Sequence, residues 1–343
     1  MPTFCRHNRL IQNCPICARE LSVELRPVIS SSAPRSAQPR PSAPGRRRSQ
    51  GTGAGGGSAG GRGRSTGGRG GSSGGLLVRR ATRGTDDGYR SPLAPGLRSS
   101  REAERLADEL AFAATRLQVL AEDPPGLYAE VADPLGDLEE RTWLAFLIAY
   151  LCPIDADDPF AGIEAVRTPW ASESAPELAG APTGPRSAYD AARASRTLEA
   201  YRGWAGRSGS QSAAFTGEPA WTPERRFARA YERLALPALH RDARFDLLVT
   251  LGWLGVYELE AGSLALGGDN RVTVAAKRGL GIGDPHLLER RAAELAAGCG
   301  VPLAALDLGL FNWESGERAS LGLGPGAEAS PDVQAAARAA LGL

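Results

Sequence analysis

Residues 240–284 read HRDARFDLLVTLGWLGVYELEAGSLALGGDNRVTVAAKRGLGIGD. An apolar run with helical spacing, residues 245–251, leads into the short glycine-bearing turn GWLG at 252–255. A second apolar run, residues 256–266, follows the turn, and we interpret it as a second helix. Two helices joined by such a turn form a helix-hairpin unit, because glycine accepts positive φ and lets two backbones approach closely.

The turn is a predicted phosphate site. A helix that starts directly after the turn presents free N–H groups and the positive end of its dipole. We therefore predict a phosphate site at this turn, with Leu251, Gly252, Gly255 and Tyr257 as its residues. The alternative is an ordinary turn between two core helices, since a short L-G-x-x-G pattern has low specificity.

An acid and three basic side chains follow the second run. Two glycines precede Asp269, which is a candidate catalytic carboxylate, because an ionised acid can stabilise a developing positive charge or activate a nucleophile. Arg271 is expected to bind a phosphate or to neutralise the acid in part, and Lys277 and Arg278 are further basic side chains close to it in sequence. In the alternative interpretation, Asp269 caps the helix that starts near Arg271.

The order of hairpin, acid and basic segment resembles the helix-hairpin-helix DNA glycosylase superfamily. Leu251-Gly-Trp-Leu-Gly255 takes the place of its L-P-G-V-G-type hairpin, Asp269-Asn-Arg-Val272 of its acid segment, and Lys277-Arg-Gly-Leu-Gly281 of the continuation. Gly252 stands where proline is usual, and the expected helix between hairpin and acid is about two turns shorter than usual. Within the superfamily, roughly residues 99–313 are most similar to the α-glutamyl/putrescinyl thymine pyrophosphorylase-like proteins, clade 3.

The resemblance implies an all-α bundle that acts on a DNA base, and such chemistry requires the base to be turned out of the duplex. It implies that Asp269 is the catalytic residue beside C1′ of the sugar. The implied DNA contacts are the residues of the turn together with Arg271, Lys277 and Arg278. Tyr257 stands where bifunctional members carry a nucleophilic lysine, so the implied reaction has no lyase step. Hydrolysis of a glycosidic bond and group transfer onto a thymine methyl group both remain open. Two other hypotheses of function remain. One is a DNA-binding module without catalysis, which combines several weak contacts. The other is a helical domain with no role in nucleic-acid binding.

Residues 1–24 hold a predicted zinc knuckle. Four potential ligands, Cys5, His7, Cys14 and Cys17, lie within thirteen residues. Tetrahedral zinc takes four nitrogen or sulfur donors, and a C-x-x-C turn presents two thiolates together. We expect a structural zinc ion here. The alternatives are a coincidental cluster or a redox motif, and a redox C-x-x-C normally lies on a strand-helix unit that this segment lacks.

Residues 25–98 form a predicted disordered linker. From Leu25 to Thr85 the chain has twelve arginines and no acidic residue, with a Gly/Ser-rich centre. Such a composition buries too little apolar surface to offset the entropy of ordering. The segment is interpreted either as an arginine-rich arm that touches nucleic-acid phosphates or as a solvated tether.

Residues 99–320 form the predicted glycosylase-like domain. Helical patterns cover residues 99–122, 135–151, 187–205, 222–236, 286–300 and 301–316. Loops are expected at 165–185 and 207–221, which are rich in small and polar residues. Residues 321–343 are expected to be a peripheral helix or tail. Since no alternating strand pattern of sufficient length is present, the predicted fold class is all-α.

Composition restricts the remaining function classes. The net charge is +1, and Lys277 is the one lysine beside many arginines. No apolar window reaches the ~18 residues of a membrane span, and no secretory signal is recognisable. Five cysteines fit a reducing compartment better than a disulfide framework. We expect a cytoplasmic, nucleoid-associated protein that binds DNA, has no membrane segment and has no obligate protein partner.

Overall fold

The computed structural model describes residues 85–172, 174–324 and 326–343. These residues form helices and connecting segments and no strand, which confirms the all-α fold class. The zinc knuckle and most of the predicted linker lie outside the described residues. The helices are α2 (Ser100–Glu122), α3 (Leu127–Ala132), α4 (Leu138–Leu151), α5 (Ala161–Val166), α6 (Ala194–Arg207), α7 (Gln211–Thr216), α8 (Pro223–Arg233), α9 (Arg241–Trp253), α10 (Arg271–Leu280), α11 (Pro285–Gly298), α12 (Leu303–Ser315) and α13 (Pro331–Leu341).

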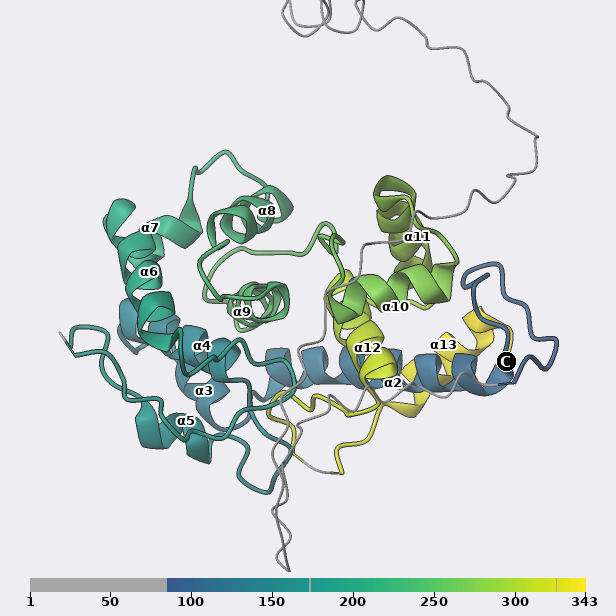
Figure 1. Ribbon diagram of the computed structural model, residues 1–343, viewed down its shortest axis with the longest axis horizontal. Coiled ribbons are helices and arrows are strands. Elements are labelled where there is room, and N and C mark those ends of the chain that lie inside the picture. Colours follow the sequence, from purple (N-terminus) through teal and green to yellow (C-terminus); the bar gives the residue numbers. More distant parts are fainter. Residues whose placement is uncertain (1–84, 173, 325) are drawn as a thin grey trace, which may run out of the picture. The chain divides into compact units, whose positions relative to one another are not determined.

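The long helix α2 connects two groups of helices (Figure 1). Helices α12 and α13 pack along α2, and α10 packs on α12 and α11. In the other group α4 packs against α9, α3 and α7, while α8 lies against α7 and α9. Helix α9 also reaches α2, so it faces the boundary between the two groups.

Helix α4 forms the centre of its group because it is apolar on all sides. Every residue from Thr142 to Leu151 is buried. Its N-terminus is capped by Asp137, whose side chain accepts the N–H of Glu140 at 3.0 Å. The helix ends at Cys152, which has a positive φ of 60° and precedes a proline, as the sequence predicted.

Aromatic rings fix α4 against α6 and α7. The rings of Phe146 and Tyr201 stack with centroids 3.8 Å apart, and Trp143 stacks on Phe146 at 5.3 Å. Trp204 on α6 meets Phe215 on α7 edge to face at 5.0 Å. Offset and edge-to-face pairs add to the burial of large apolar surfaces, so this group is held by its aromatic core.

The folded part begins earlier than predicted. Residues 85–98 were expected to belong to the disordered linker, but Ala94 and Leu97 are fully buried. The N–H of Gly96 donates to the carbonyl of Gly279 on α10 at 2.9 Å. A Cβ at Gly96 would lie 2.0 Å from the carbonyl oxygen of Arg278, so only glycine permits this approach. The expected boundary at residue 99 is therefore too late.

The expected second helix at residues 256–266 is wrong. The chain leaves α9 and runs without a helix until Arg271. Burial alternates here, with Tyr257 and Leu259 buried and Glu258 exposed between them, which is the pattern of an extended segment. A Cβ at Gly252 would meet the carbonyl oxygen of Leu259 at 2.2 Å, so this glycine lets the returning chain pass close to α9.

A helix pair joined by a short glycine-bearing turn is instead formed by α10 and α11. Gly281 ends α10 in the left-handed conformation with φ 67°. Asp284 caps α11 by accepting the N–H of Leu287 at 2.9 Å, and Pro285 occupies the first turn. The turn between the two helices, residues 281–284, is largely exposed.

The C-terminal segment docks on α2 through helix α13. Ala337 and Leu341 are buried, and Gln334 donates to Asp108 of α2 at 2.8 Å. Tyr89 reaches the same end of the chain and donates to the carbonyl of Leu341 at 2.5 Å. The chain from residue 321 onward is therefore part of the folded helical unit.

Candidate functional site

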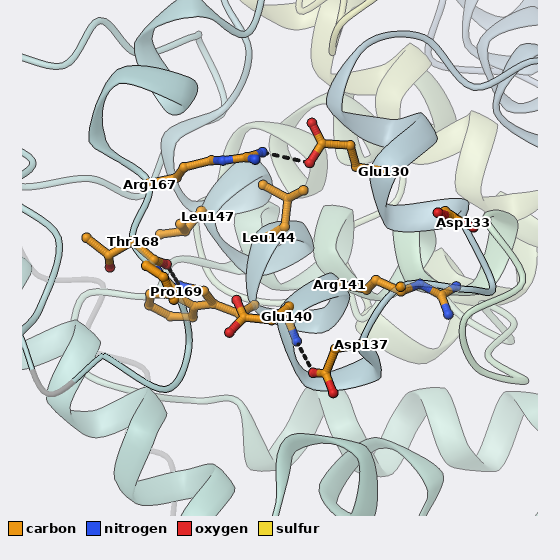
Figure 2. A pocket seen from close by; sticks show the side chains of 12 residues that line it. Glu130, Asp133, Asp137, Glu140, Arg141, Leu144, Leu147, Arg167, Thr168 and Pro169 are labelled. Carbon is orange, nitrogen blue, oxygen red and sulfur yellow. Dashed lines mark hydrogen bonds and ion pairs between the residues drawn. The ribbon is translucent and has the colours of Figure 1, made fainter.

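A cavity of ≈ 370 Å³ lies between α3, α4 and the segment after α5 (Figure 2). Its charged side chains hold local structure. Arg167 binds Glu130 at 2.8 Å, and both carboxylate oxygens of Glu140 accept the N–H of Trp170 at 2.9 Å. Asp137 is the cap of α4. Because these groups already have structural partners, we do not place the functional site here.

A second cavity, of ≈ 480 Å³, lies where the two helix groups meet. Four segments line it: the loop at 185–187, the start of α9 at 240–242, the segment 267–271 that starts α10, and Phe311 of α12. The lining includes three arginines and two carboxylates, which are Arg186, Arg241, Arg271, Asp242 and Asp269. We take this cavity as the candidate functional site.

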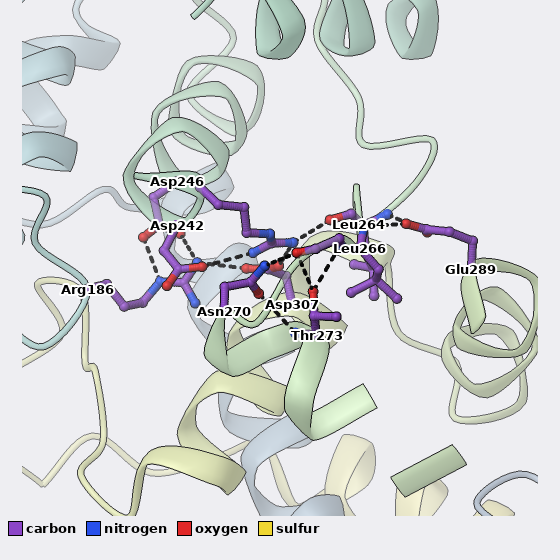
Figure 3. A network of polar contacts seen from close by, with 11 residues as sticks. Arg186, Asp242, Asp246, Leu264, Leu266, Asn270, Thr273, Glu289 and Asp307 are labelled. Atoms are coloured by element: carbon purple, nitrogen blue, oxygen red, sulfur yellow. Dashed lines mark hydrogen bonds and ion pairs between the residues drawn. The ribbon is translucent and has the colours of Figure 1, made fainter. Parts of the chain in front are cut away.

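A network of buried ion pairs adjoins this cavity and includes two of its lining arginines, Arg186 and Arg241 (Figure 3). Arg186 donates to both carboxylate oxygens of Asp246 at 2.7 and 2.8 Å, and to Asp307 at 2.7 Å. Arg241 binds the other oxygen of Asp307, the carbonyl of Leu264, and Asp242 at 3.2 Å. The network thus connects the loop before α6 with α9, α12 and the extended segment.

The two buried aspartates differ in their electrostatics. Burial acts to raise the pKa of Asp307, but the charges of Arg241 and Arg186 outweigh it and lower that pKa below its usual value. At Asp246 burial is the larger effect, and the pKa is raised despite the bonds to Arg186. Asp307 is thus the more firmly ionised of the two, and both arginines are anchored on it.

The predicted catalytic residue Asp269 lies at the mouth of the cavity. Its side chain is exposed and has no hydrogen-bond or ion-pair partner in the described part of the chain. The cap of α10 is the next residue, Asn270, whose side chain accepts the N–H of Thr273 at 2.9 Å. Asp269 is therefore not the N-cap. Arg271 donates to Ser315 at 2.9 Å and not to Asp269.

The predicted phosphate contacts at 251–257 lie in a different environment from the one expected. Leu251 is fully buried, and Tyr257 is buried with its hydroxyl 2.7 Å from that of Thr142. Burial raises the pKa of Tyr257 to about 12. The N–H groups of Gly255 and Val256 donate to the carbonyls of Gly252 and Leu251. These two N–H groups already donate within the turn. They are therefore not available to a phosphate, which removes the physical reason for placing a phosphate site there.

Free backbone donors are found instead in the turn between α10 and α11. Ile282 and Gly283 have N–H groups with no acceptor among the described residues. Lys277 belongs to the last turn of α10, but its Nζ donates to the carbonyl of Gly268, which precedes that helix, at 3.4 Å. Arg278 stacks on the ring of Trp313 at 3.7 Å and pairs with Glu314 at 3.2 Å. Of the two predicted basic contacts, only Lys277 is free of an ion pair with a described acid.

Sequence reasoning missed Arg186, Asp246 and Asp307 as members of the site. Asp307 could have been found, because an acid inside the apolar run LAALDLGLF requires a buried partner. Arg186 had no such signal, since it lies in a loop among small and polar residues. Only the fold brings it to α9 and α12.

The zinc ligands Cys5, His7, Cys14 and Cys17 lie outside the described residues. Within the described residues, no group of three or more His, Cys, Asp or Glu side chains is placed to hold a metal ion. In the same part of the chain, no single helix has the length and apolar character to cross a membrane. Only α11 and α12 together, bent by 102° at their junction, pass such a test of length and composition.

No family model matches this chain. No curated protein and no solved structure shows significant similarity to it either.

Proposed function

We propose that this protein binds DNA and acts on a base turned out of the duplex, with the cavity beside Asp269 as the reaction site. The observation that supports this proposal is what lies at the two ends of helix α10. One end of it borders a cavity lined by arginines and carboxylates, and the other end leads into an exposed turn with unpaired N–H groups. A protein that turns a base out of a nucleic-acid strand needs two features: a site that binds a backbone phosphate, and a nearby pocket that receives the base.

The separation of the two features fits a strand of DNA. Helix α10 has ten residues, from Arg271 to Leu280. At about 1.5 Å per residue it is ~15 Å long, which corresponds to roughly four steps of 3.4 Å along one strand. A phosphate held at residues 281–284 therefore leaves a nearby nucleotide within reach of the cavity.

Asp269 is the proposed reactive carboxylate. It is exposed at the mouth, where the sugar of an extruded nucleotide would remain while the base enters the cavity. A carboxylate there stabilises positive charge at C1′ or activates a nucleophile. Hydrolysis of the glycosidic bond and transfer of a group onto a pyrimidine both fit this placement, and modified pyrimidines are the proposed substrate class.

A DNA-binding module without catalysis is the second candidate. It is favoured by the same exposure of Asp269, which no side chain in the described part of the chain orients. Catalytic carboxylates are commonly held by packing and hydrogen bonds. In this case the cavity would hold a turned-out base without changing it.

A zinc knuckle at Cys5, His7, Cys14 and Cys17 is a further part of the proposal, as a second DNA contact at the nucleoid. Its support is the spacing of the four donors. Elemental analysis of the full chain is expected to give one zinc per molecule, and Cys14→Ser is expected to lose it. A metal content unchanged by that substitution would contradict the ligand set.

The deciding experiment uses duplex DNA that carries assorted modified pyrimidines. After incubation, mass spectrometry identifies bases released from the DNA or altered within it. The parent chain is compared with Asp269→Asn and with Asp158→Asn, a change in an exposed loop away from the cavity. We expect turnover by the parent and by Asp158→Asn, and DNA binding without turnover by Asp269→Asn.

Two results would contradict the proposal in different ways. DNA binding by all three proteins with no base changed favours the non-catalytic module. Turnover that survives Asp269→Asn removes the role of this carboxylate, and Asp242 on the cavity wall becomes the next acid to test. Absence of DNA binding by the parent excludes both candidates.

A further inference from the structure

Arg186 has a hydrogen-bond donor that the protein leaves without a partner. Its side chain is completely buried. Nε and Nη2 are bound by Asp246 and Asp307, but Nη1 has no hydrogen-bond partner among the described residues. Nearly all buried donors in folded proteins are paired. A guanidinium with a spare N–H group that lines a cavity can donate to a molecule bound in that cavity.

A second arginine of the same cavity shares this property. Arg241 is also buried, and its Nε has no partner among the described residues. Both arginines line the cavity together with Arg271, whose side chain is exposed at its mouth. Three guanidinium groups from the loop before α6, from α9 and from α10 therefore converge on one space.

The cavity wall offers an anion free N–H donors, and not an excess of positive charge. The lining carries three arginines and two acids, Asp242 and Asp269, and Asp246 and Asp307 behind it bring the acids to four. Asp242 is already bound to Arg241. The acids behind the wall, Asp246 and Asp307, are paired with arginine. A guanidinium binds oxyanions through parallel N–H groups.

We propose that this end of the cavity binds a phosphate group of the ligand, with Arg186 and Arg241 as buried donors and Arg271 as the donor at the mouth. Donors from three separate segments suit the oxygens of a tetrahedral phosphate better than the two oxygens of a planar carboxylate. The cavity, at ≈ 480 Å³, accommodates a group larger than the ion itself. This inference rests on the proposed function in placing substrate and phosphate in one cavity.

The phosphate belongs either to the DNA strand or to a small molecule that reacts with the base. The shared chemistry is tested first, with inorganic phosphate and pyrophosphate as probes. Each is titrated by calorimetry into the full chain without DNA, at constant ionic strength set with sodium chloride. We expect saturable binding of at least one probe.

Variants locate the binding. Arg271→Ala removes the donor at the mouth, and Arg186→Lys keeps the charge but loses the planar fork. Arg229→Ala is the control, since Arg229 is an exposed arginine of α8 that pairs with Glu232. Loss of one charge-assisted hydrogen bond is expected to weaken binding at least about tenfold in the first two variants, with no change in Arg229→Ala. Where Arg186→Lys fails to fold, Arg271→Ala decides alone.

Absence of saturable binding by both probes overturns the inference, as does equal binding by parent and Arg271→Ala. Addition of duplex DNA then identifies the source of the phosphate. Displacement of the probe assigns the site to a DNA phosphate, and DNA binding with the probe in place assigns it to a small phosphate-bearing molecule. A chain that binds the probe but no DNA contradicts the proposed function alone.

Discussion

At the scale of single residues, Asp307 has the largest structural role at the site. It is the one acid in the apolar run of α12 at residues 303–311, and it binds both Arg186 and Arg241. A buried ion pair adds little net stability compared with a well-packed apolar group, but removal of one partner leaves the other charge uncompensated. Two arginines depend on this one carboxylate.

We therefore expect Asp307→Asn to lower the free energy of unfolding by about 3–5 kcal/mol, measured by urea denaturation. The amide keeps the shape of the side chain and removes its charge. Asp332→Asn, at an exposed position of α13, is the matched control and is expected to change stability little. A loss below about 1 kcal/mol would place the pair in a solvated environment and contradict the buried network.

Tyr257 gives a pH-dependent prediction. Burial raises its pKa from 10.0 to about 12. Its hydroxyl donates to Thr142, because the Thr142 hydroxyl itself donates to the carbonyl of Leu138 at 2.6 Å. The phenolate cannot donate. The neutral form is present in both folded and unfolded chains below pH 10, so the stabilisation is complete there and is lost as pH rises from 10 to 12.

The expected loss over this window is about 2 kcal/mol, since one pKa unit corresponds to ~1.4 kcal/mol. Unfolding free energies measured between pH 9 and 12 test it. Tyr257→Phe is expected to be less stable than the parent at pH 9 and to lose less stability on going to pH 12. Parallel curves for parent and variant would show that Tyr257 does not titrate in the folded chain at a raised pKa.

At the scale of elements, the sequence predicted most helices and misplaced the helix pair. The predicted helix starts at 135, 222 and 286 lie within three residues of the observed starts at Leu138, Pro223 and Pro285, because start signals are local. Residues 256–266 were misread because their apolar residues suggested a helix, while the alternation Val-Tyr-Glu-Leu-Glu indicated an extended segment. The turn at 252–255 ends α9, and the paired helices are α10 and α11.

Substitutions in the two glycine-bearing turns, residues 281–284 and residues 252–255, are expected to have opposite effects on DNA binding. Gly283 lies in an open turn, and a Cβ there would meet nothing within 4 Å. Gly283→Asn is expected to fold normally and to weaken duplex binding, because the added side chain blocks the close approach of a phosphate. Gly255→Asn is the control, since asparagine tolerates the left-handed φ of 67° at that position.

Fluorescence anisotropy with a labelled duplex measures both variants against the parent, and thermal melting checks the fold. Gly255→Asn is expected to bind like the parent. Weakened binding in Gly255→Asn with normal binding in Gly283→Asn would return the phosphate contact to the turn at 252–255.

At the scale of the whole molecule, the helical patterns and the lack of an alternating strand pattern predicted the all-α class, and the site arises from contacts between distant segments. Arg186 and Asp307 are separated by 121 positions and meet only in the folded chain. No local pattern indicates such a pair, because a loop arginine and a helical acid are each common alone. Asp269 and Arg271 were singled out from the sequence by their place directly after two glycines that follow an apolar run, and both line the cavity.

The arginine-rich arm gives the last prediction. Residues 26–84 carry twelve arginines and no acid, whereas the residues after them pack on the folded part through Ala94 and Leu97. Deletion of 26–84 therefore removes the charge and keeps the packed segment. Each phosphate contact contributes roughly 0.9 to the slope of log affinity against log salt on duplex DNA. We expect the deletion to lower affinity at low salt and to make this slope shallower, with unchanged thermal melting. An unchanged slope would make the arm a solvated tether and leave all phosphate contacts to the helical unit.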